Sequence, residues 1–151
     1  MSMNFENYAA KGNEMIHKLS IELTVPRDQA ARILRAVLHA LRERLTLEEN
    51  FDFLSQLTMI IKGVYIDGYN PGKSFVHSRS LEDFLDDIRS ADPNAAGHDL
   101  GNDARTKWLV QGVFRILNEY ISEGEMKDIV NVLPKKIGTF ITETMYDKEF
   151  F

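Results

Sequence analysis

Apolar residues recur along the chain at steps of three and four, the spacing that places them on one face of an α-helix. The clearest stripe consists of Ala30, Ile33, Leu34, Val37, Leu38, Leu41 and Leu45. A second stripe consists of Leu109, Val110, Val113, Phe114, Leu117 and Ile121. No stretch sustains the alternation of apolar and polar residues that is typical of strands. The pattern therefore predicts an all-α protein.

The two stripes belong to an internal repeat, because residues 27–65 align with residues 103–141 without a gap, at an offset of 76 residues. Identical pairs at this offset include Val37 and Val113, Leu41 and Leu117, Glu49 and Glu125, Asp52 and Asp128, and Ile61 and Ile137. An apolar helix precedes each aligned stretch, with Met15, Ile16 and Leu19 matching Phe84, Leu85 and Ile88. Repetition of a whole core pattern indicates a duplicated structural unit.

Local signals divide each repeat into about four helices. Thr46 with Glu49, and Ser122 with Glu125, have the spacing of a capping box at the start of a helix. Pro134 ends one helix of the second repeat and begins the next. We therefore expect residues 1–151 to form a single domain of about eight helices. It consists of two tandem four-helix units, residues 5–69 and 80–146, with residues 70–79 as the connector. We expect the units to share one core around a pseudo-twofold axis.

The amino-acid composition excludes several kinds of functional site and disfavours some partners. The chain has no cysteine, which excludes disulfides, thiolate zinc sites, iron–sulfur clusters and a cysteine nucleophile. Neither a signal peptide nor an apolar run of about 20 residues is readable, so we expect a cytoplasmic protein without a membrane segment. The formal net charge of −5 disfavours a surface built to bind phosphate backbones, and we do not expect nucleic acid to be the main partner.

Several motifs resemble those of the prokaryotic DUF2267 family: the run from Arg32 to Leu45, Gln56-Leu57, Val64-Tyr65, Asp67-Gly68-Tyr69 and Glu82-Asp83-Phe84-Leu85. The resemblance covers nearly the whole chain. Two positions depart from it, because the family usually has proline where this chain has Thr58 and often tryptophan where it has Tyr69. The resemblance implies a small prokaryotic helical protein of a family with no established activity.

Three local motifs fall short of a site. Residues 68–74 end like a phosphate-binding P-loop but have three residues, not four, between their glycines. Glu14 and His17 have the spacing of metal ligands in a helical bundle, but no second copy of the motif occurs. The carboxylates of one helix face are more simply explained as a solvated surface: Glu82, Asp83, Asp86 and Asp87. We therefore expect no metal site, no cofactor and no catalytic residue.

One polar stripe remains as a candidate for binding a ligand or partner: Arg32, Arg35, His39 and Arg42, at steps of three, four and three. The residues found 76 positions later are Trp108, Gln111, Arg115 and Asn118, so the repeated fold does not itself require the charge. The basic stripe could contact an anionic ligand, an acidic partner or phosphates. Alternatively, it pairs with the acidic face of the helix that contains Glu82, or is solvated.

These features favour a non-enzymatic cytoplasmic module for binding or assembly, since no complete catalytic constellation is present. A protein partner or a homo-oligomer would suit such a module. The alternative function is weak binding of nucleic acid or another anion through the basic stripe.

Overall fold

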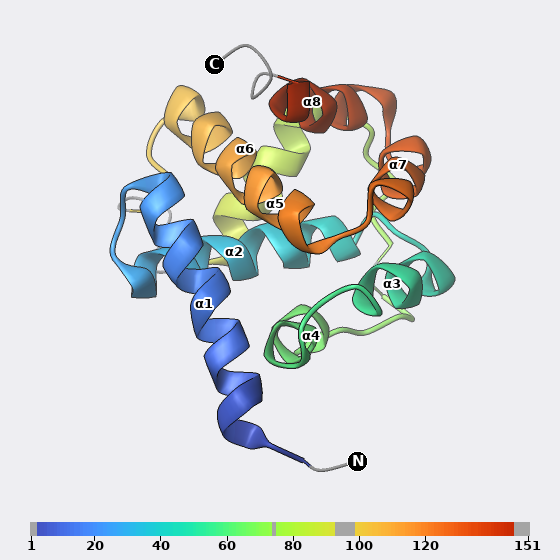
Figure 1. The fold of residues 1–151 in the computed structure, drawn as a ribbon. Helices are drawn as coiled ribbons and strands as arrows, with labels where there is room; N and C mark the ends of the chain where they lie inside the picture. The colour runs from blue at the N-terminus through green and yellow to red at the C-terminus, as the bar shows by residue number, and fades with distance from the viewer. Residues whose placement is uncertain (1–2, 74, 93–98, 147–151) are drawn as a thin grey trace.

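The computed structural model describes residues 3–73, 75–92 and 99–146. Within them the chain forms eight α-helices and no strand (Figure 1). In chain order these are α1 (Phe5–Leu23), α2 (Arg27–Arg42), α3 (Leu47–Leu54), α4 (Met59–Ile66), α5 (Leu81–Ala91), α6 (Asp103–Tyr120), α7 (Glu123–Val132) and α8 (Lys135–Tyr146). The prediction of an all-α protein with about eight helices is confirmed.

Capping side chains start α3 and α7, but not in the same way. The Thr46 hydroxyl accepts a hydrogen bond from the Glu49 N–H at 3.2 Å, and the Thr46 N–H donates to the Glu49 carboxylate at 2.8 Å, so the first capping box is complete. The Ser122 hydroxyl likewise accepts from the Glu125 N–H. The Ser122 N–H, however, donates to the side-chain oxygen of Gln56 at 3.3 Å. The second predicted box is therefore only half formed, because a side chain from the other half of the chain provides the acceptor.

Helices in the two halves of the chain begin at matching positions. Helices α2, α3 and α4 start at residues 27, 47 and 59, and α6, α7 and α8 start at residues 103, 123 and 135, which is 76 residues later in each case. Pro134 lies between α7 and α8, as predicted from its missing N–H. The break between α3 and α4 occurs at residues 55–58 without a proline.

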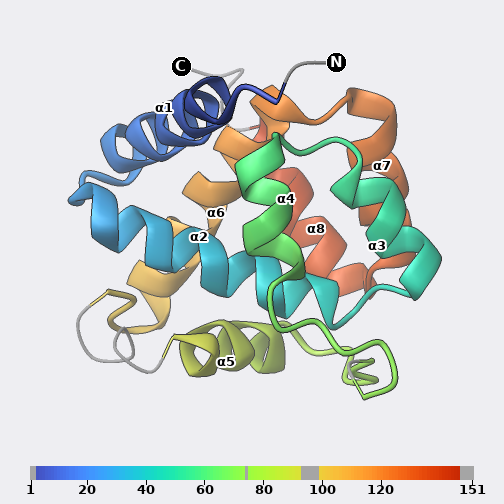
Figure 2. The same cartoon turned by 90° about the horizontal axis from the view of Figure 1, so that it is seen from below.

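A single cluster of buried apolar side chains contains residues from all eight helices, with Phe53, Phe84 and Phe114 among its largest fully buried members. Helix α2 packs against α1, α4, α5 and α6, and α6 packs against α1, α2, α5 and α8. In Figure 2, α2 crosses between α1 and α5. In the described part of the chain, no helix has the length and apolar content needed to cross a membrane.

Two glycines allow close contacts between helices. A Cβ atom at Gly112 of α6 would lie 2.3 Å from a methyl carbon of Leu23, so the glycine lets α1 approach α6. A Cβ atom at Gly138 of α8 would lie 2.9 Å from the backbone oxygen of Val130, so the glycine lets α8 fold back closely on α7. The second contact shapes the turn at Pro134, which borders a cavity described below.

Candidate functional site

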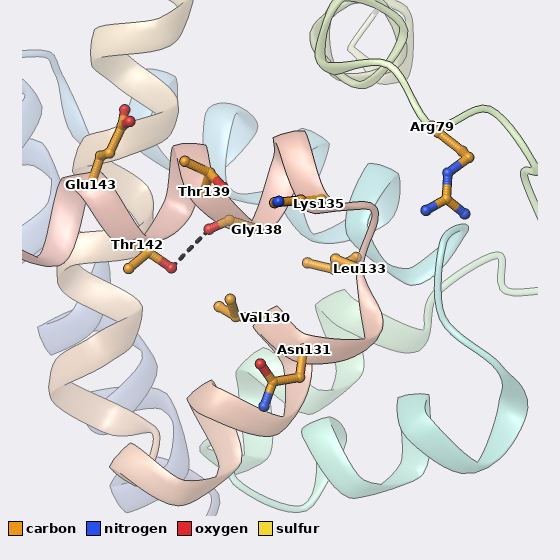
Figure 3. A pocket seen from close by; sticks show the side chains of 9 residues that line it. All are labelled: Arg79, Val130, Asn131, Leu133, Lys135, Gly138, Thr139, Thr142 and Glu143. Carbon is orange, nitrogen blue, oxygen red and sulfur yellow. Dashed lines mark hydrogen bonds between the residues drawn. The ribbon is translucent and has the colours of Figure 1, made fainter.

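A cavity of about 590 Å³ lies between the connector that leads into α5 and the turn between α7 and α8 (Figure 3). The residues that line it are Arg79, Val130, Asn131, Leu133, Lys135, Gly138, Thr139, Thr142 and Glu143. None of the four residues of the basic stripe is among them. The sequence-predicted site and this cavity are therefore separate features of the molecule.

The first two residues of the basic stripe form ion pairs within the chain. The Arg32 Nε donates to the Asp99 carboxylate at 2.8 Å, and a second guanidinium nitrogen lies 3.3 Å from Asp28. The hydrogen bond to Asp99, which is buried, raises the pKa of Arg32 above its ordinary value. Arg35 donates to the Asp67 carboxylate at 3.1 Å, and both side chains stay largely exposed. The charge of this part of the stripe is balanced locally.

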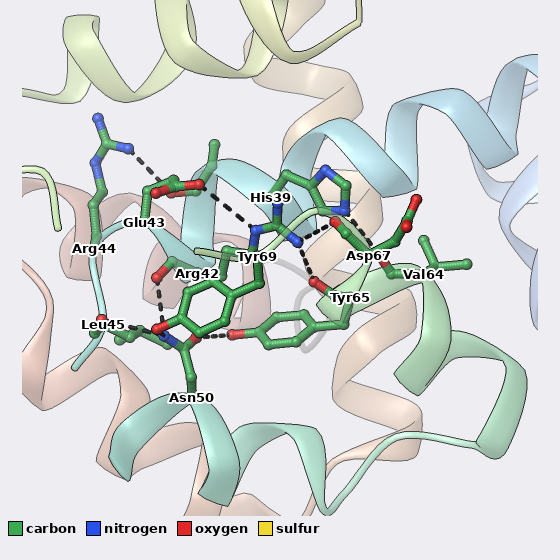
Figure 4. Close-up of polar contacts among 11 residues, drawn as sticks. His39, Arg42, Glu43, Arg44, Leu45, Asn50, Val64, Tyr65, Asp67 and Tyr69 are labelled. Atoms are coloured by element: carbon green, nitrogen blue, oxygen red, sulfur yellow. Dashed lines mark hydrogen bonds and ion pairs between the residues drawn. The ribbon is translucent and has the colours of Figure 1, made fainter. Parts of the chain in front are cut away.

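The other two residues of the basic stripe, His39 and Arg42, cap the end of α4 (Figure 4). The last carbonyls of a helix have no hydrogen-bond donor within the helix. The His39 Nε2 lies 2.7 Å from the Val64 oxygen, and one Arg42 nitrogen donates to the oxygens of Tyr65 at 2.7 Å and Asp67 at 2.6 Å. The stripe thus provides the donors that α4 lacks.

Burial controls the charge of this cap. His39 and Arg42 are 8 % and 5 % exposed, and burial lowers the pKa of both side chains below their ordinary values. A neutral His39 can donate its Nε2 proton to the Val64 carbonyl, which is consistent with the short contact. An anion at this stripe would compete with the contacts that hold the end of α4.

Pairing of the basic stripe with the acidic face of α5 is not what the structure shows. Arg44, which lies outside the stripe, makes that contact, with a guanidinium nitrogen 2.7 Å from the Asp87 carboxylate. Asp86 pairs with Arg89 on the same helix, also at 2.7 Å. Pairing with that face was one of the alternatives left open, but Arg32 and Arg35 pair with carboxylates at residues 28, 67, 92 and 99 instead.

A buried polar network links α3 to the ends of α2 and α4. The Asn50 amide nitrogen lies within hydrogen-bond distance of the backbone oxygens of Arg42 and Leu45 and of the Tyr69 hydroxyl, at 3.0 to 3.2 Å. The Tyr65 hydroxyl donates to the Asn50 side-chain oxygen. Burial raises the pKa of Tyr65, so its hydroxyl stays protonated and available as a donor. The sequence analysis did not identify this network.

A shallow apolar groove lies over this network, between α3 and α4. Its lining residues are Leu47, Asn50, Phe51, Leu54, Tyr65, Ile66 and Tyr69. Three of them are unusually exposed for their type: Leu47 at 48 %, Phe51 at 55 % and Ile66 at 43 %. About half of each of these three side chains is open to solvent, so α3 and α4 present an apolar surface at this groove. Such surfaces mark interaction sites in many proteins.

A comparison of the two halves of the sequence contains a signal for this groove that the sequence analysis overlooked. The residues found 76 positions after Leu47, Phe51 and Ile66 are Glu123, Lys127 and Thr142. Polar residues therefore occupy the corresponding positions of the second half, where α7 and α8 still form. Apolar side chains at the three first-half positions are not a requirement of the helices themselves. The same comparison that identified the basic stripe would have identified the groove.

The described residues of the remaining sequence motifs make contacts of their own. Glu14 lies 3.5 Å from Lys18, and His17 forms a hydrogen bond with Arg27 at 2.8 Å. Across the described residues, no cluster of three or more histidine, aspartate or glutamate side chains could hold a metal ion. The P-loop-like segment follows a helix and begins with a left-handed Gly68 (φ 74°), and its last residue, Ser74, lies outside the described residues.

Comparison with known proteins shows the family of the chain. No curated protein matches it. The sequence does match the model of a family described as "Uncharacterized conserved protein (DUF2267)" over residues 12–140. The matched region contains all of α2 to α7, and with them the α3–α4 groove and the basic stripe. Because this match covers most of the chain, the protein belongs to the DUF2267 family.

Proposed function

We propose that the protein is a non-enzymatic binding module that acts in the cytoplasm and docks a partner protein on the α3–α4 groove. The observation that carries the proposal is the exposed apolar surface formed by Leu47, Phe51 and Ile66. Exposing these side chains has a hydrophobic cost of about 25 cal/mol for each Å² of apolar surface, which a partner that buries them would recover.

We further propose that the module consists of two repeats, residues 5–69 and 80–146, joined by residues 70–79 into one domain around a pseudo-twofold axis. The matched helix starts support this arrangement. So does the packing, because α1 packs on α6 as α5 packs on α2, and α4 packs on α1 as α8 packs on α5. Helices α3 and α7 also contact each other. The groove is then a specialisation of the first repeat.

The charge beside the groove favours a basic partner. The exposed carboxylates of Glu48 and Asp52 alternate with the groove-lining side chains of α3. Lys62 is the cation nearest to Ile66 along α4. The chain has a net charge of −5, so a second copy of it would be repelled at this surface, whereas a basic helix would be attracted. We therefore infer that the partner presents an amphipathic helix with apolar anchors and flanking lysine or arginine.

The basic stripe is the weaker choice for a binding surface. Arg32 and Arg35 are paired with carboxylates, and His39 and Arg42 bind the backbone at the end of α4. A ligand would have to displace these contacts before it gained its own. The stripe instead supports the groove, since it fixes the helix end that carries Ile66.

Titration with a designed peptide tests the groove. The probe is a synthetic amphipathic helix of leucine and lysine, added to ¹⁵N-labelled protein, and the measurement is the change in amide chemical shifts. We expect saturable shifts concentrated in residues 47–54 and 65–69. Phe51→Ser should weaken binding about tenfold or more, because a buried aromatic anchor contributes about 2 kcal/mol or more.

Two controls make the test specific. Ile21→Ser removes an apolar side chain that is 65 % exposed on α1, and it should leave the affinity unchanged. A peptide with glutamate in place of lysine should bind much more weakly than the basic peptide. The proposal is wrong if Phe51→Ser and Ile21→Ser have equal effects, or if the shifts spread over the whole surface.

A further inference from the structure

The exposed side chains of α4 are all apolar. Met59, Ile60 and Ile66 are exposed, and Gly63 is exposed between them. Met59 lies seven residues before Ile66, which is about two helical turns, so the two side chains share one face of α4. Because Ile66 lines the α3–α4 groove, the apolar surface of the groove continues along the outward face of α4 to Met59.

Neighbouring helices extend this surface on either side of α4 (Figure 2). On one side lies α3, with the exposed Leu47 and Phe51. On the other side lies α1, where a Cβ atom at Gly12 would be 3.1 Å from the Cβ atom of Ile60. Phe5 lies seven residues before Gly12, on the same face of α1, and is 70 % exposed. The groove is therefore one part of a wider apolar surface, of the kind that marks an interaction site.

The glycine at the centre of this outward face is not required by the packing of the described chain. A glycine inside a helix destabilises it relative to alanine. Gly12, Gly112 and Gly138 are explained by neighbours that a Cβ atom would meet at 3.1 Å or less. At Gly63 a Cβ atom would meet no described atom within 4 Å, and the backbone is helical, so alanine would fit. Gly124 is also open, but it lies in the first turn of α7, where helices fray.

The second half of the chain shows that a helix at this place needs neither the glycine nor the apolar face. The residues found 76 positions after Met59, Ile60 and Gly63 are exposed residues of α8: Lys135, Lys136 and Thr139. Helix α8 therefore forms with a polar outward face, and with a β-branched side chain at the position of the glycine. The apolar face and the glycine of α4 are thus additions to the repeated pattern, and both lie on the same surface.

We propose that the partner helix lies along the outward face of α4 and places one large apolar side chain over Gly63, between Met59 and Ile66; this rests on the proposed function. A glycine between larger residues leaves a recess in the helix surface, which can accept a side chain as a knob enters a hole. It also lets the backbone of another chain come close. Met59 and Ile66 lie about 10 Å apart along the helix axis, at 1.5 Å per residue, so the contact occupies about two turns of the partner.

Substitutions of Gly63 should change stability and binding in opposite directions. Gly63→Ala and Gly63→Gln should both raise the midpoint of thermal unfolding, because alanine and glutamine form helices more readily than glycine. Both should weaken binding of the synthetic leucine–lysine helix, because the added side chain fills the space that the partner needs. We expect a loss of affinity of about fivefold or more for Gly63→Ala and a larger loss for Gly63→Gln. The affinity is measured by titration of ¹⁵N-labelled protein, in which the amide shifts should extend to residues 59–63.

Gly124→Ala is the matched control, because it adds a methyl group at an open glycine outside the apolar surface, and it should leave the affinity unchanged. Equal losses for Gly124→Ala and Gly63→Ala would refute a contact at Gly63. If Gly63→Ala binds like the parent while Phe51→Ser binds more weakly, the partner does not reach Gly63 and only the proposed function stands. If the parent does not bind the peptide, both are wrong. Light scattering should show a monomer, and a dimer that Gly63→Gln dissociates would mean that a second copy, not a basic helix, covers this face.

Discussion

Replacement of Arg42 by methionine tests whether the basic stripe serves the fold. Methionine keeps most of the aliphatic length of arginine but has no donor. The Arg42 guanidinium donates to the backbone oxygens of Tyr65 and Asp67, at 2.7 and 2.6 Å, and lies 5.6 Å from the centre of the Tyr69 ring. The substitution therefore removes two hydrogen bonds and a cation–π contact at the end of α4.

The size of the effect follows from the burial of the two acceptors. The hydrogen bond to Tyr65 is buried, and a buried carbonyl left without a donor costs about 1 to 3 kcal/mol. The hydrogen bond to Asp67 is only partly buried, so water can replace the donor at a cost of about 1 kcal/mol or less. Burial of the Arg42 cation is itself unfavourable, as its lowered pKa indicates, and the substitution relieves that cost. We expect a net loss of about 2 to 3 kcal/mol in the free energy of unfolding.

Urea denaturation followed by circular dichroism at a helical wavelength measures this loss. Arg35→Met is the matched control, because Arg35 lies on the same stripe and pairs with Asp67 in a largely exposed ion pair. Such pairs contribute about 1 kcal/mol or less. Arg42→Lys should fall between the two, because one ammonium group cannot reproduce the planar fork of a guanidinium. Equal losses for Arg42→Met and Arg35→Met would refute the capping role.

Two further predictions concern glycines and pH. Gly63→Ala should stabilise the protein by about 0.5 to 1 kcal/mol, because Gly63 lies inside α4 and a Cβ atom there meets nothing within 4 Å. Gly138→Ala should instead destabilise the protein, because its Cβ atom would lie 2.9 Å from the Val130 backbone oxygen. Thermal unfolding of the two variants measures both effects. Since the folded state lowers the pKa of His39, its contribution to stability is present above the unfolded pKa of about 6.5 and is lost as the pH falls below it. Urea denaturation at pH 5 and pH 7 should show a lower free energy of unfolding at pH 5, with a slope of at most about 1.4 kcal/mol per pH unit from this group. The substitution His39→Gln should reduce the difference between the two pH values.

The sequence was sufficient for the helices because their signals are local. Apolar spacing, the Thr46 cap and Pro134 each act within a few residues, and the structure places α2, α3 and α8 where those signals predicted. The Ser122 cap was only half correct because its second partner, Gln56, is distant in the sequence. A capping motif specifies that an N–H group needs an acceptor, but it does not specify which acceptor comes closest after folding.

The candidate site was harder to predict because its character depends on which helix ends meet. Periodicity placed Arg35, His39 and Arg42 on one face of a helix, and it could not show that this face meets the last carbonyls of α4. Nor could it show that Phe51, which has the spacing of a core residue, would be more than half exposed. Both outcomes are set by contacts between helices, which a pattern of single positions does not contain.

The length of the last helix in each half explains why the capping contacts of His39 and Arg42 are needed only in the first half. Helix α4 ends at Ile66, whereas α8 continues to Tyr146, four residues past the corresponding position. The carbonyls around residues 64–67 therefore need outside donors, while those 76 positions later lie inside a continuing helix. The second half accordingly uses the position that corresponds to His39 differently: Arg115 pairs with Glu22 of α1, at 2.5 Å. The capping role of His39 and Arg42 follows from where α4 ends, and that early end places Ile66 at the edge of the α3–α4 groove.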